Sequence, residues 1–240
     1  MEEDLQIDQS VTAEIKLYYD LYVPAPTTLS AEAALPAGGE LRRPLLIAVH
    51  GYGAHKRYML REARAVAPKG WVIASVQAPH QHFRKTDDGY RIGFGWLTDH
   101  NPAESVALHQ KFLLDVIARL SADALIDRSQ VYLFGFSQAC ALNFRFAFTH
   151  PGSVAGVIGV CGGIPGDLDT NPAYQPFNAP TFYLYGNDDE FYTEAKFAEF
   201  DKKLRERLPN YHSKQYTAKH EITEEMRIDI RGILGGKRPM

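Results

Sequence analysis

A serine in a setting typical of a nucleophile stands near the middle of the chain. It is Ser137, in the segment Gly-Phe-Ser-Gln-Ala at 135–139, between an apolar run at 131–134 and a helix-like run that starts at Cys140. A serine on a strand-to-helix corner has a strained backbone, and the residues two before and two after it must be small. Gly135 and Ala139 meet this requirement, although the strict pattern has glycine at both places. The alternative is an ordinary turn with a solvated serine.

An acid and a base follow, each after another predicted strand. Asp188 and Asp189 stand in an acidic loop after a run at 181–185, where a carboxylate can orient a histidine. Adjacent aspartates are also common turn formers and helix caps, so at least one of the pair should be structural, and we select Asp189 for catalysis. His220 follows a predicted last strand at 213–217 and precedes a helix that opens at Thr223.

The order of these three residues favours one kind of chemistry. A lone loop histidine is most often a surface residue, and the chain has nine histidines. Serine, then acid, then histidine, each just after a strand, is however the order of an α/β-hydrolase triad. In such a triad, Ser137 attacks an acyl carbon, His220 takes the serine proton, and Asp189 holds the imidazole in the correct tautomer.

Two backbone amides are candidates for an oxyanion hole. The apolar run at 45–49 reads as a buried parallel strand, and it leads directly into His-Gly-Tyr-Gly at 50–53. In serine hydrolases of this architecture, the oxyanion is held by the amide after the nucleophile and by an amide of this early loop. These amides would belong to Gln138 and Tyr52. We interpret His50 as a structural residue that bridges loop backbones.

Together, the segments at 50–53, 135–139 and 186–189 and the histidine at 220 resemble the phospholipase/carboxylesterase family, which includes acyl-protein thioesterases. The resemblance spans about 44–234. It implies esterase or thioesterase activity on a small-molecule or acyl ester, with no metal and no cofactor. In that family the acid stands three residues after a glycine that ends a strand, which selects Asp189 over Asp188. Ala139 and the absence of a proline after the acid are departures, and they leave the substrate range open.

The pattern of elements predicts a single α/β-hydrolase domain over 1–240. Buried strands alternate with helices, including helices at 56–67 and after a cap at Asn101, which argues for a mostly parallel central sheet with helices on both faces. Alternation over 12–23 predicts one or two antiparallel strands at the N-terminal edge. A stretch at 24–43, rich in Pro, Ala and Gly, reads as a long surface loop.

A loop near 78–98 is expected beside the catalytic edge, because it follows a predicted strand at 71–76. Its aromatic residues either wall a substrate pocket or anchor the loop to the core. As substrate-binding candidates we take Trp96 from this loop, with Tyr52 and Phe191 nearby. His80 and His82 have no evident third partner for a metal, and we interpret them as loop residues.

Composition excludes several functions. The net charge is −3, which provides no general attraction to nucleic acid. No apolar stretch is long enough to be a transmembrane segment, and the acidic start is unlike a signal peptide, so we expect a cytoplasmic protein. Both cysteines, Cys140 and Cys161, should then be buried free thiols. No surface stripe predicts an oligomeric state.

Three alternatives remain open at the level of sequence. The chain could be a non-catalytic binding protein of the α/β-hydrolase fold, which keeps the pocket without turnover. An amidase or peptidase would use the same triad and differ in the leaving group. Finally, Cys140 could act as the nucleophile in place of the serine, since it lies close behind it, but Ser137 holds the corner position.

Overall fold

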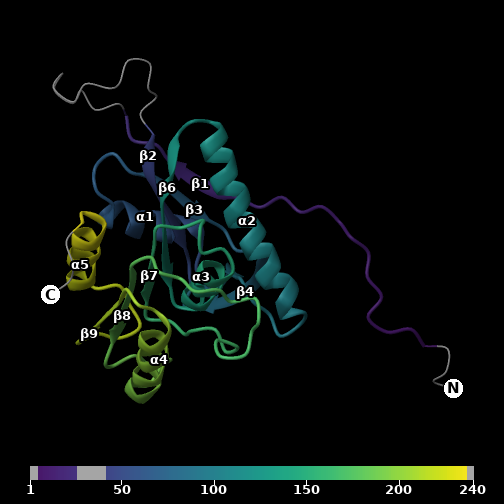
Figure 1. The fold of residues 1–240 in the computed structure, drawn as a ribbon. Coiled ribbons are helices and arrows are strands. Elements are labelled where there is room, and N and C mark those ends of the chain that lie inside the picture. The colour runs from purple at the N-terminus through teal and green to yellow at the C-terminus, as the bar shows by residue number, and fades with distance from the viewer. Residues whose placement is uncertain (1–4, 26–41, 237–240) are drawn as a thin grey trace.

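A central sheet of seven strands organises the computed structural model, which describes residues 5–25 and 42–236. Of the predicted surface loop at 24–43, positions 26–41 lie outside the described residues. The strands stand in the order β1-β3-β2-β6-β7-β8-β9 (Figure 1). Their bounds are β1 Tyr19–Tyr22, β2 Arg43–Val49, β3 Val72–Val76, β6 Ile126–Phe136, β7 Gly156–Val160, β8 Thr181–Gly186 and β9 Tyr211–Tyr216. Only the pairing of β1 with β3 is antiparallel in this sheet, which confirms the predicted mixed, mostly parallel architecture.

In the described part of the chain, five helices cover both faces of the sheet: α1 Lys56–Val66, α2 Pro102–Ala122, α3 Gln138–Thr149, α4 Glu194–Arg207 and α5 Glu224–Leu234. Alternate residues of β2 enter two separate hydrophobic cores, with Ile47 on one face and Leu46 on the other. The first core is closed by α2, α3 and α4, and the second by α1 and α5, so that α2 and α5 lie on opposite sides of the sheet (Figure 1). A strand buried on both faces must be apolar throughout, as 45–49 is. No helix in the described part of the chain is both long and apolar enough to cross a membrane.

The helix starts depend on local capping. The Thr193 and Thr223 hydroxyls accept hydrogen bonds from the amides of Lys196 and Met226, at α4 and α5 respectively. Asn101 precedes α2 as predicted, but it adopts a left-handed conformation with φ 46° and ψ 54°, and its amide contacts His100 instead of capping the helix. Asparagine tolerates this region better than most residues, so the boundary holds without the predicted cap.

The N-terminal edge is shorter than predicted. Residues 12–18 are outside any strand, and only β1 pairs with the sheet, through Tyr19 opposite Val76. Ile15, predicted to be half-buried, is 57% exposed. The reason is that β3 ends at Val76, so residues before β1 have almost no sheet edge left to pair with.

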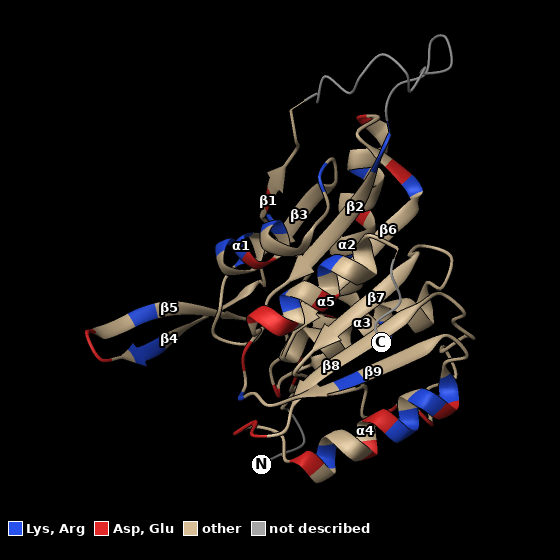
Figure 2. Cartoon of the chain, turned by 90° about the vertical axis from the view of Figure 1, so that its left-hand side faces the viewer, with Lys and Arg blue, Asp and Glu red and all other residues tan. Residues whose placement is uncertain are grey.

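The predicted loop at 78–98 is largely a β-hairpin. Strands β4 His80–Thr86 and β5 Gly89–Gly95 pair antiparallel and project from the body of the protein as an arm (Figure 2). Asp87 and Asp88 form its two-residue tip, and Gly89 follows with a φ of 112°. Aspartates followed by a glycine are typical turn residues, but the charges and glycines along both strands hide the alternation that would have predicted a hairpin.

The end of β7 packs tightly on the start of α3. A Cβ atom added at Gly162 would lie 2.1 Å from the carbonyl oxygen of Ser137 and 2.5 Å from the sulfur of Cys140. At the next residue, Gly163, the nearest atom to an added Cβ is the Tyr192 hydroxyl oxygen, at 3.5 Å. The first position therefore requires glycine, and the second has room for a methyl group.

We predict that Gly162→Ala lowers the free energy of unfolding by about 1–3 kcal/mol or more, because the added methyl group must displace backbone atoms. Urea denaturation measures this change. Gly163→Ala is the matched control and should change stability by less than about 0.5 kcal/mol, as expected where no contact is compressed. Equal stability of the two variants would contradict the packing described for this corner.

Candidate active site

Ser137 lies at the corner between β6 and α3 in a strained conformation, with φ 57° and ψ −122°. Its amide donates to the Val160 carbonyl oxygen at 2.9 Å, which ties the corner to the end of β7. A Cβ atom added at Gly135 would lie 2.6 Å from the Asn143 side chain and 3.3 Å from the Cβ of Ala139. The corner therefore needs small residues at 135 and 139, as the sequence indicated. A non-glycine residue with such a backbone costs about 1–3 kcal/mol and is found mainly at functional sites.

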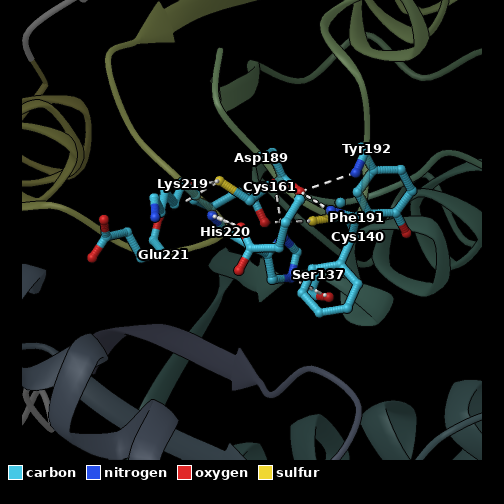
Figure 3. A network of polar contacts seen from close by, with 12 residues as sticks. Ser137, Cys140, Cys161, Asp189, Phe191, Tyr192, Lys219, His220 and Glu221 are labelled. Carbon is cyan, nitrogen blue, oxygen red and sulfur yellow. Dashed lines mark hydrogen bonds and ion pairs between the residues drawn. The ribbon is translucent and has the colours of Figure 1, made fainter.

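His220 and Asp189 complete a chain of hydrogen bonds from the serine (Figure 3). The Ser137 Oγ is 2.8 Å from Nε2 of His220, and Nδ1 of His220 is 2.7 Å from Oδ2 of Asp189. The other carboxylate oxygen of Asp189 accepts from the amides of Phe191 and Tyr192 at 2.8 and 3.0 Å. Two backbone donors thus fix the carboxylate, and the carboxylate fixes the tautomer in which Nε2 of His220 can accept the serine proton.

The neighbouring aspartate has a different position. Asp188 is exposed, and its amide donates to the Ala218 carbonyl oxygen at 3.0 Å, so its backbone holds two loops together while its side chain faces solvent. The approach of these loops is close: a Cβ atom added at Gly186 would lie 2.1 Å from the oxygen of Ala218. Gly186 therefore lets the segment that carries Asp189 reach the segment that carries His220.

The two candidate oxyanion residues come from two different segments beside the serine. Gln138 occupies the first position of α3, where the helix itself offers no acceptor for the backbone amide. Tyr52 belongs to the loop after β2, and this loop passes very close to the corner: a Cβ atom added at Gly51 would lie 2.9 Å from the Cβ of Ser137. Tyr52, Gln138 and Ser137 line one cleft.

His50 holds the loop after β2 from inside the protein. Its Nδ1 donates to the Gly51 carbonyl oxygen at 2.7 Å, and its Nε2 accepts from the Gln77 side chain and the Ala78 amide at 2.9 and 3.1 Å. Burial lowers the pKa of His50 to about 4. The ring is therefore neutral near pH 7 and bridges loop backbones, which confirms the structural interpretation of this histidine.

Trp96 does not have the substrate-binding role predicted for it. The indole is 1% exposed, and its Nε1 donates to the His50 carbonyl oxygen at 2.8 Å. Its backbone amide donates to the side-chain oxygen of Gln138 at 2.9 Å, and its ring packs edge-on against His109 of α2. Of the two roles considered for the aromatic residues of this segment, Trp96 thus has the anchoring one, because α2 closes over it.

Tyr52 and Phe191 do line the cleft, which has a volume of about 840 Å³. Their side chains are 62% and 71% exposed, and the Phe191 ring lies 4.6 Å from the ring of His220. Most of the remaining wall was not identified from sequence: Gly51, Gly53, Ala54, Tyr58, Arg84, Leu97, Phe136, Ala141, Gly163, Ile164, Tyr192 and Phe200. These residues come from distant segments, and apart from the placement of the hairpin beside the catalytic edge no sequence signal joins them.

The two cysteines lie in different places around the site: Cys140 is behind the serine, and Cys161 lies against the carbonyl oxygens of Lys219 and Glu221. Both are free and buried, as predicted. Cys140 directs its thiol toward the carbonyl oxygens of Gly135 and Val160. Burial raises the pKa of Cys140 well above its usual range and raises that of Cys161 to about 12. Neither thiol forms an appreciable amount of thiolate near pH 7, which argues against a cysteine nucleophile.

Among residues 5–25 and 42–236, no group of three or more His, Cys, Asp or Glu side chains is placed to hold a metal ion. His80 contacts the Ser105 hydroxyl at 3.0 Å, and His82 stacks on Tyr52 with ring centres 4.4 Å apart. His80 thus contacts α2, and His82 contacts the loop after β2.

Comparison with known proteins gives matches over most of the chain. Residues 31–234 match the family described as Phospholipase/Carboxylesterase. "Putative esterase NocK" of Nocardia uniformis subsp. tsuyamanensis is 26% identical over 162 residues, which are 65% of this chain and 42% of that protein. The chain thus spans less than half the length of this curated relative.

Solved structures share the fold at low identity. Esterase PE8 has a TM-score of 0.68 and 18% identity, and the match covers 92% of this chain and 99% of that one. The Bacillus cereus carboxylesterase has a TM-score of 0.66 and 15% identity, covering 92% and 94%. Zea mays acyl-protein thioesterase 2 has a TM-score of 0.63 and 14% identity, covering 91% and 98%.

The packing beneath Trp96 predicts how stability depends on pH. His109 is buried, and neither ring nitrogen has a hydrogen-bond partner among the described residues. Burial lowers the pKa of His109 to about 3, so the unfolded chain binds a proton below about pH 6.5 that the folded protein does not, and stability falls as the pH falls.

We therefore predict that His109→Leu reduces the loss of unfolding free energy between pH 8 and pH 5. The expected reduction is about 2 kcal/mol, because pH 5 is about 1.5 pH units below the ordinary pKa of histidine and each unit corresponds to about 1.4 kcal/mol. Urea denaturation at the two pH values measures it. His212→Leu, at a less buried histidine, is the control. An unchanged pH dependence in His109→Leu would contradict the assignment of a neutral His109.

Proposed function

The chain belongs to the phospholipase/carboxylesterase family of α/β hydrolases, and on that premise we propose that it hydrolyses carboxylic esters or thioesters with Ser137 as the nucleophile. The observation that carries the proposal is the unbroken chain of hydrogen bonds from Ser137 through His220 to Asp189, at 2.8 and 2.7 Å. Its members follow the ends of three strands, and Ser137 and His220 line the cleft.

The reaction would proceed in two halves. Nε2 of His220 removes the hydroxyl proton as Ser137 Oγ attacks the acyl carbon, and the imidazolium then gives this proton to the leaving alcohol or thiol. Water attacks the acyl-enzyme with the same base and releases the acid. Asp189 stabilises the imidazolium in both halves, because its carboxylate is held by two amides and faces Nδ1 of His220.

The amides of Tyr52 and Gln138 would hold the oxyanion of the tetrahedral intermediate. Each such donor contributes on the order of 3 kcal/mol to transition-state stabilisation. Because the donors are backbone groups, their position depends on the loop after β2 and on the start of α3. The side-chain oxygen of Gln138, bonded to the Trp96 amide, fixes that start against the base of the arm.

The cleft supports an acyl or aryl ester as substrate. Apolar and aromatic side chains such as Ile164, Phe191 and Phe200 provide surface for such groups. No metal and no cofactor enters the proposed mechanism. Cytoplasmic location and a single domain over 1–240 are part of the same proposal, together with a substrate that is a small molecule or acyl ester rather than nucleic acid.

We expect wild-type protein to hydrolyse 4-nitrophenyl esters within a series from acetyl to palmitoyl, and Ser137→Ala to lose nearly all turnover without loss of thermal stability. A maximum at short acyl chains would identify a small-molecule carboxylesterase, and a maximum at long chains would favour lipids or acyl-proteins. Full activity in folded Ser137→Ala would refute the nucleophile. If wild type cleaved no ester, thioester or amide, the alternative of a non-catalytic binding protein would be supported.

The adjacent aspartates provide a matched test of the acid. Asp189→Asn should lower kcat by about 10³- to 10⁴-fold, because an amide does not stabilise the imidazolium or enforce the correct tautomer. Asp188→Asn removes the same charge one residue away and should change kcat by less than about twofold, since this exposed side chain lies outside the hydrogen-bond chain. Steady-state kinetics on one ester decides between them, and equal losses in the two variants would contradict the assignment.

A further inference from the structure

The arm places a cation at the cleft of the proposed active site. Arg84 of β4 lines the cleft together with Ser137 and His220, and it is the only lysine or arginine that does so among the described residues. No aspartate or glutamate belongs to the same described lining. Asp189 is adjacent, but its side chain is 0% exposed and is occupied by His220. The described lining therefore holds one positive side chain and no carboxylate. Glu190, outside this lining, accepts a hydrogen bond from the His220 amide at 3.1 Å.

The guanidinium of Arg84 has spare hydrogen-bonding capacity. Its single acceptor within the described chain is the Gly53 carbonyl oxygen, at a long 3.4 Å. A guanidinium has five N–H donors in a planar fork that matches a carboxylate or a phosphate. Most of these donors are thus available to an anion in the cleft.

The contact between the Arg84 guanidinium and Gly53 limits the distance from this guanidinium to Ser137. Gly53 is two residues from Gly51, the position at which an added Cβ would lie 2.9 Å from the Cβ of Ser137. Two residues of extended chain span about 7 Å. The guanidinium is therefore held within a few atoms' length of a substrate bound at Ser137.

The arm itself is fitted closely to this loop. Gly53 donates its amide to the Phe94 carbonyl oxygen at 2.8 Å. A Cβ atom added at Gly93 would lie 3.1 Å from the Cα of Gly53, and one added at Gly95 would lie 3.0 Å from the Tyr52 ring. In a strand these two glycines point to the same face, and Arg84 shares that face of the hairpin with them. The face that carries Arg84 is thus the face that lies on the loop after β2.

The charge arrangement of the arm is not the one that stability alone would favour. Arg84 stands directly opposite Arg91 in the hairpin register, and like charges in such a pair are destabilising. Arg91 has an acidic partner, Asp88 at 3.4 Å, and Arg84 has none among the described residues. Figure 2 shows Lys and Arg positions in blue along the arm and acidic positions in red at its tip.

We propose that Arg84 is a specificity-determining residue that binds an anionic group of the substrate, so that the protein prefers esters with a carboxylate or similar oxyanion a few atoms from the scissile carbonyl. This inference rests on the proposed esterase function and names the substrate class of that same site. The carboxylate would pair with the guanidinium at the Tyr52 and Gly53 side of the cleft, while the ester carbonyl lies at Ser137.

Two matched pairs of esters test the proposal on either side of the scissile bond. Monomethyl succinate and methyl butyrate have acyl chains of equal length and differ by a carboxylate in place of a methyl group. 3-(Butyryloxy)benzoate and phenyl butyrate have the same acyl group and differ by a carboxylate on the leaving group. The quantity measured is the ratio of kcat/KM for the anionic ester to kcat/KM for its neutral partner, at low ionic strength.

We expect this ratio to exceed one in at least one pair and to fall about tenfold in Arg84→Gln, mainly through KM. Arg84→Lys should keep part of the preference, since it keeps the charge and loses the fork. Arg91→Gln removes the same charge at the opposite position, outside the cleft, and should change the ratio by less than about twofold. Added salt should weaken the wild-type preference, because the site is exposed.

The inference is overturned if wild type prefers neither anionic ester, or if Arg84→Gln and Arg91→Gln lower the ratio equally. Turnover that survives in Ser137→Ala would instead count against the proposed function. Binding gives an independent measurement: Ser137→Ala titrated calorimetrically with 3-(butyryloxy)benzoate should bind it more tightly than the Ser137→Ala/Arg84→Gln double variant does. Equal affinities would overturn the role of Arg84 whatever the turnover.

Discussion

The strained backbone of Ser137 is the constraint on which the site depends. A φ of 57° at a residue with a side chain is unfavourable, and it persists because the surroundings hold it from several directions. The Val160 carbonyl accepts its amide, Gly162 lets β7 approach its carbonyl oxygen, and Gly135 admits the side chain of Asn143 beside the corner. The neighbouring strands therefore do more than support the sheet, because the ends of β6 and β7 together set the direction of the serine.

The parallel sheet brings the remaining groups to the same edge. Strands β2, β6, β8 and β9 run in one direction, so the residues that follow them, Tyr52, Ser137, Asp189 and His220, gather at their common carboxyl ends. Strand β7 lies between β6 and β8 and supplies Val160, whose carbonyl oxygen accepts the Ser137 amide. The loop after β9 must therefore extend across β8 and β7 for His220 to contact Ser137. Gly186 makes this reach possible, because any side chain there would collide with the loop that carries His220.

The sequence was most informative where local chemistry and strand periodicity coincide. Ser137, Asp189 and His220 each follow a predicted strand, and the structure brings the three together, as their order indicated. Trp96 was predicted wrongly, because its burial depends on His109 of α2 and on the carbonyl of His50, neither of which is adjacent in sequence. Sequence reasoning treats the hairpin as a loop, although Asp87, Asp88 and Gly89 mark a turn, because many residues of its two strands are charged or glycine rather than apolar. Contacts between distant elements, not local propensity, decide such cases.

The arm carries Arg84, the proposed substrate contact, and it also packs against Tyr52, whose amide is a proposed oxyanion donor. Its inner face needs glycine at 93 and 95 to lie against Tyr52 and Gly53, and the last strand residues lead directly to Trp96, which anchors both His50 and Gln138. The two candidate oxyanion amides are therefore braced by the same element that carries Arg84. A change of residue size on the inner face of the arm would move Tyr52 along with any ligand contact, whereas a change at the charged end of Arg84 alters only what the cleft attracts. Under the proposal made for Arg84, substrate preference can therefore change at position 84 while the geometry around Ser137 is kept.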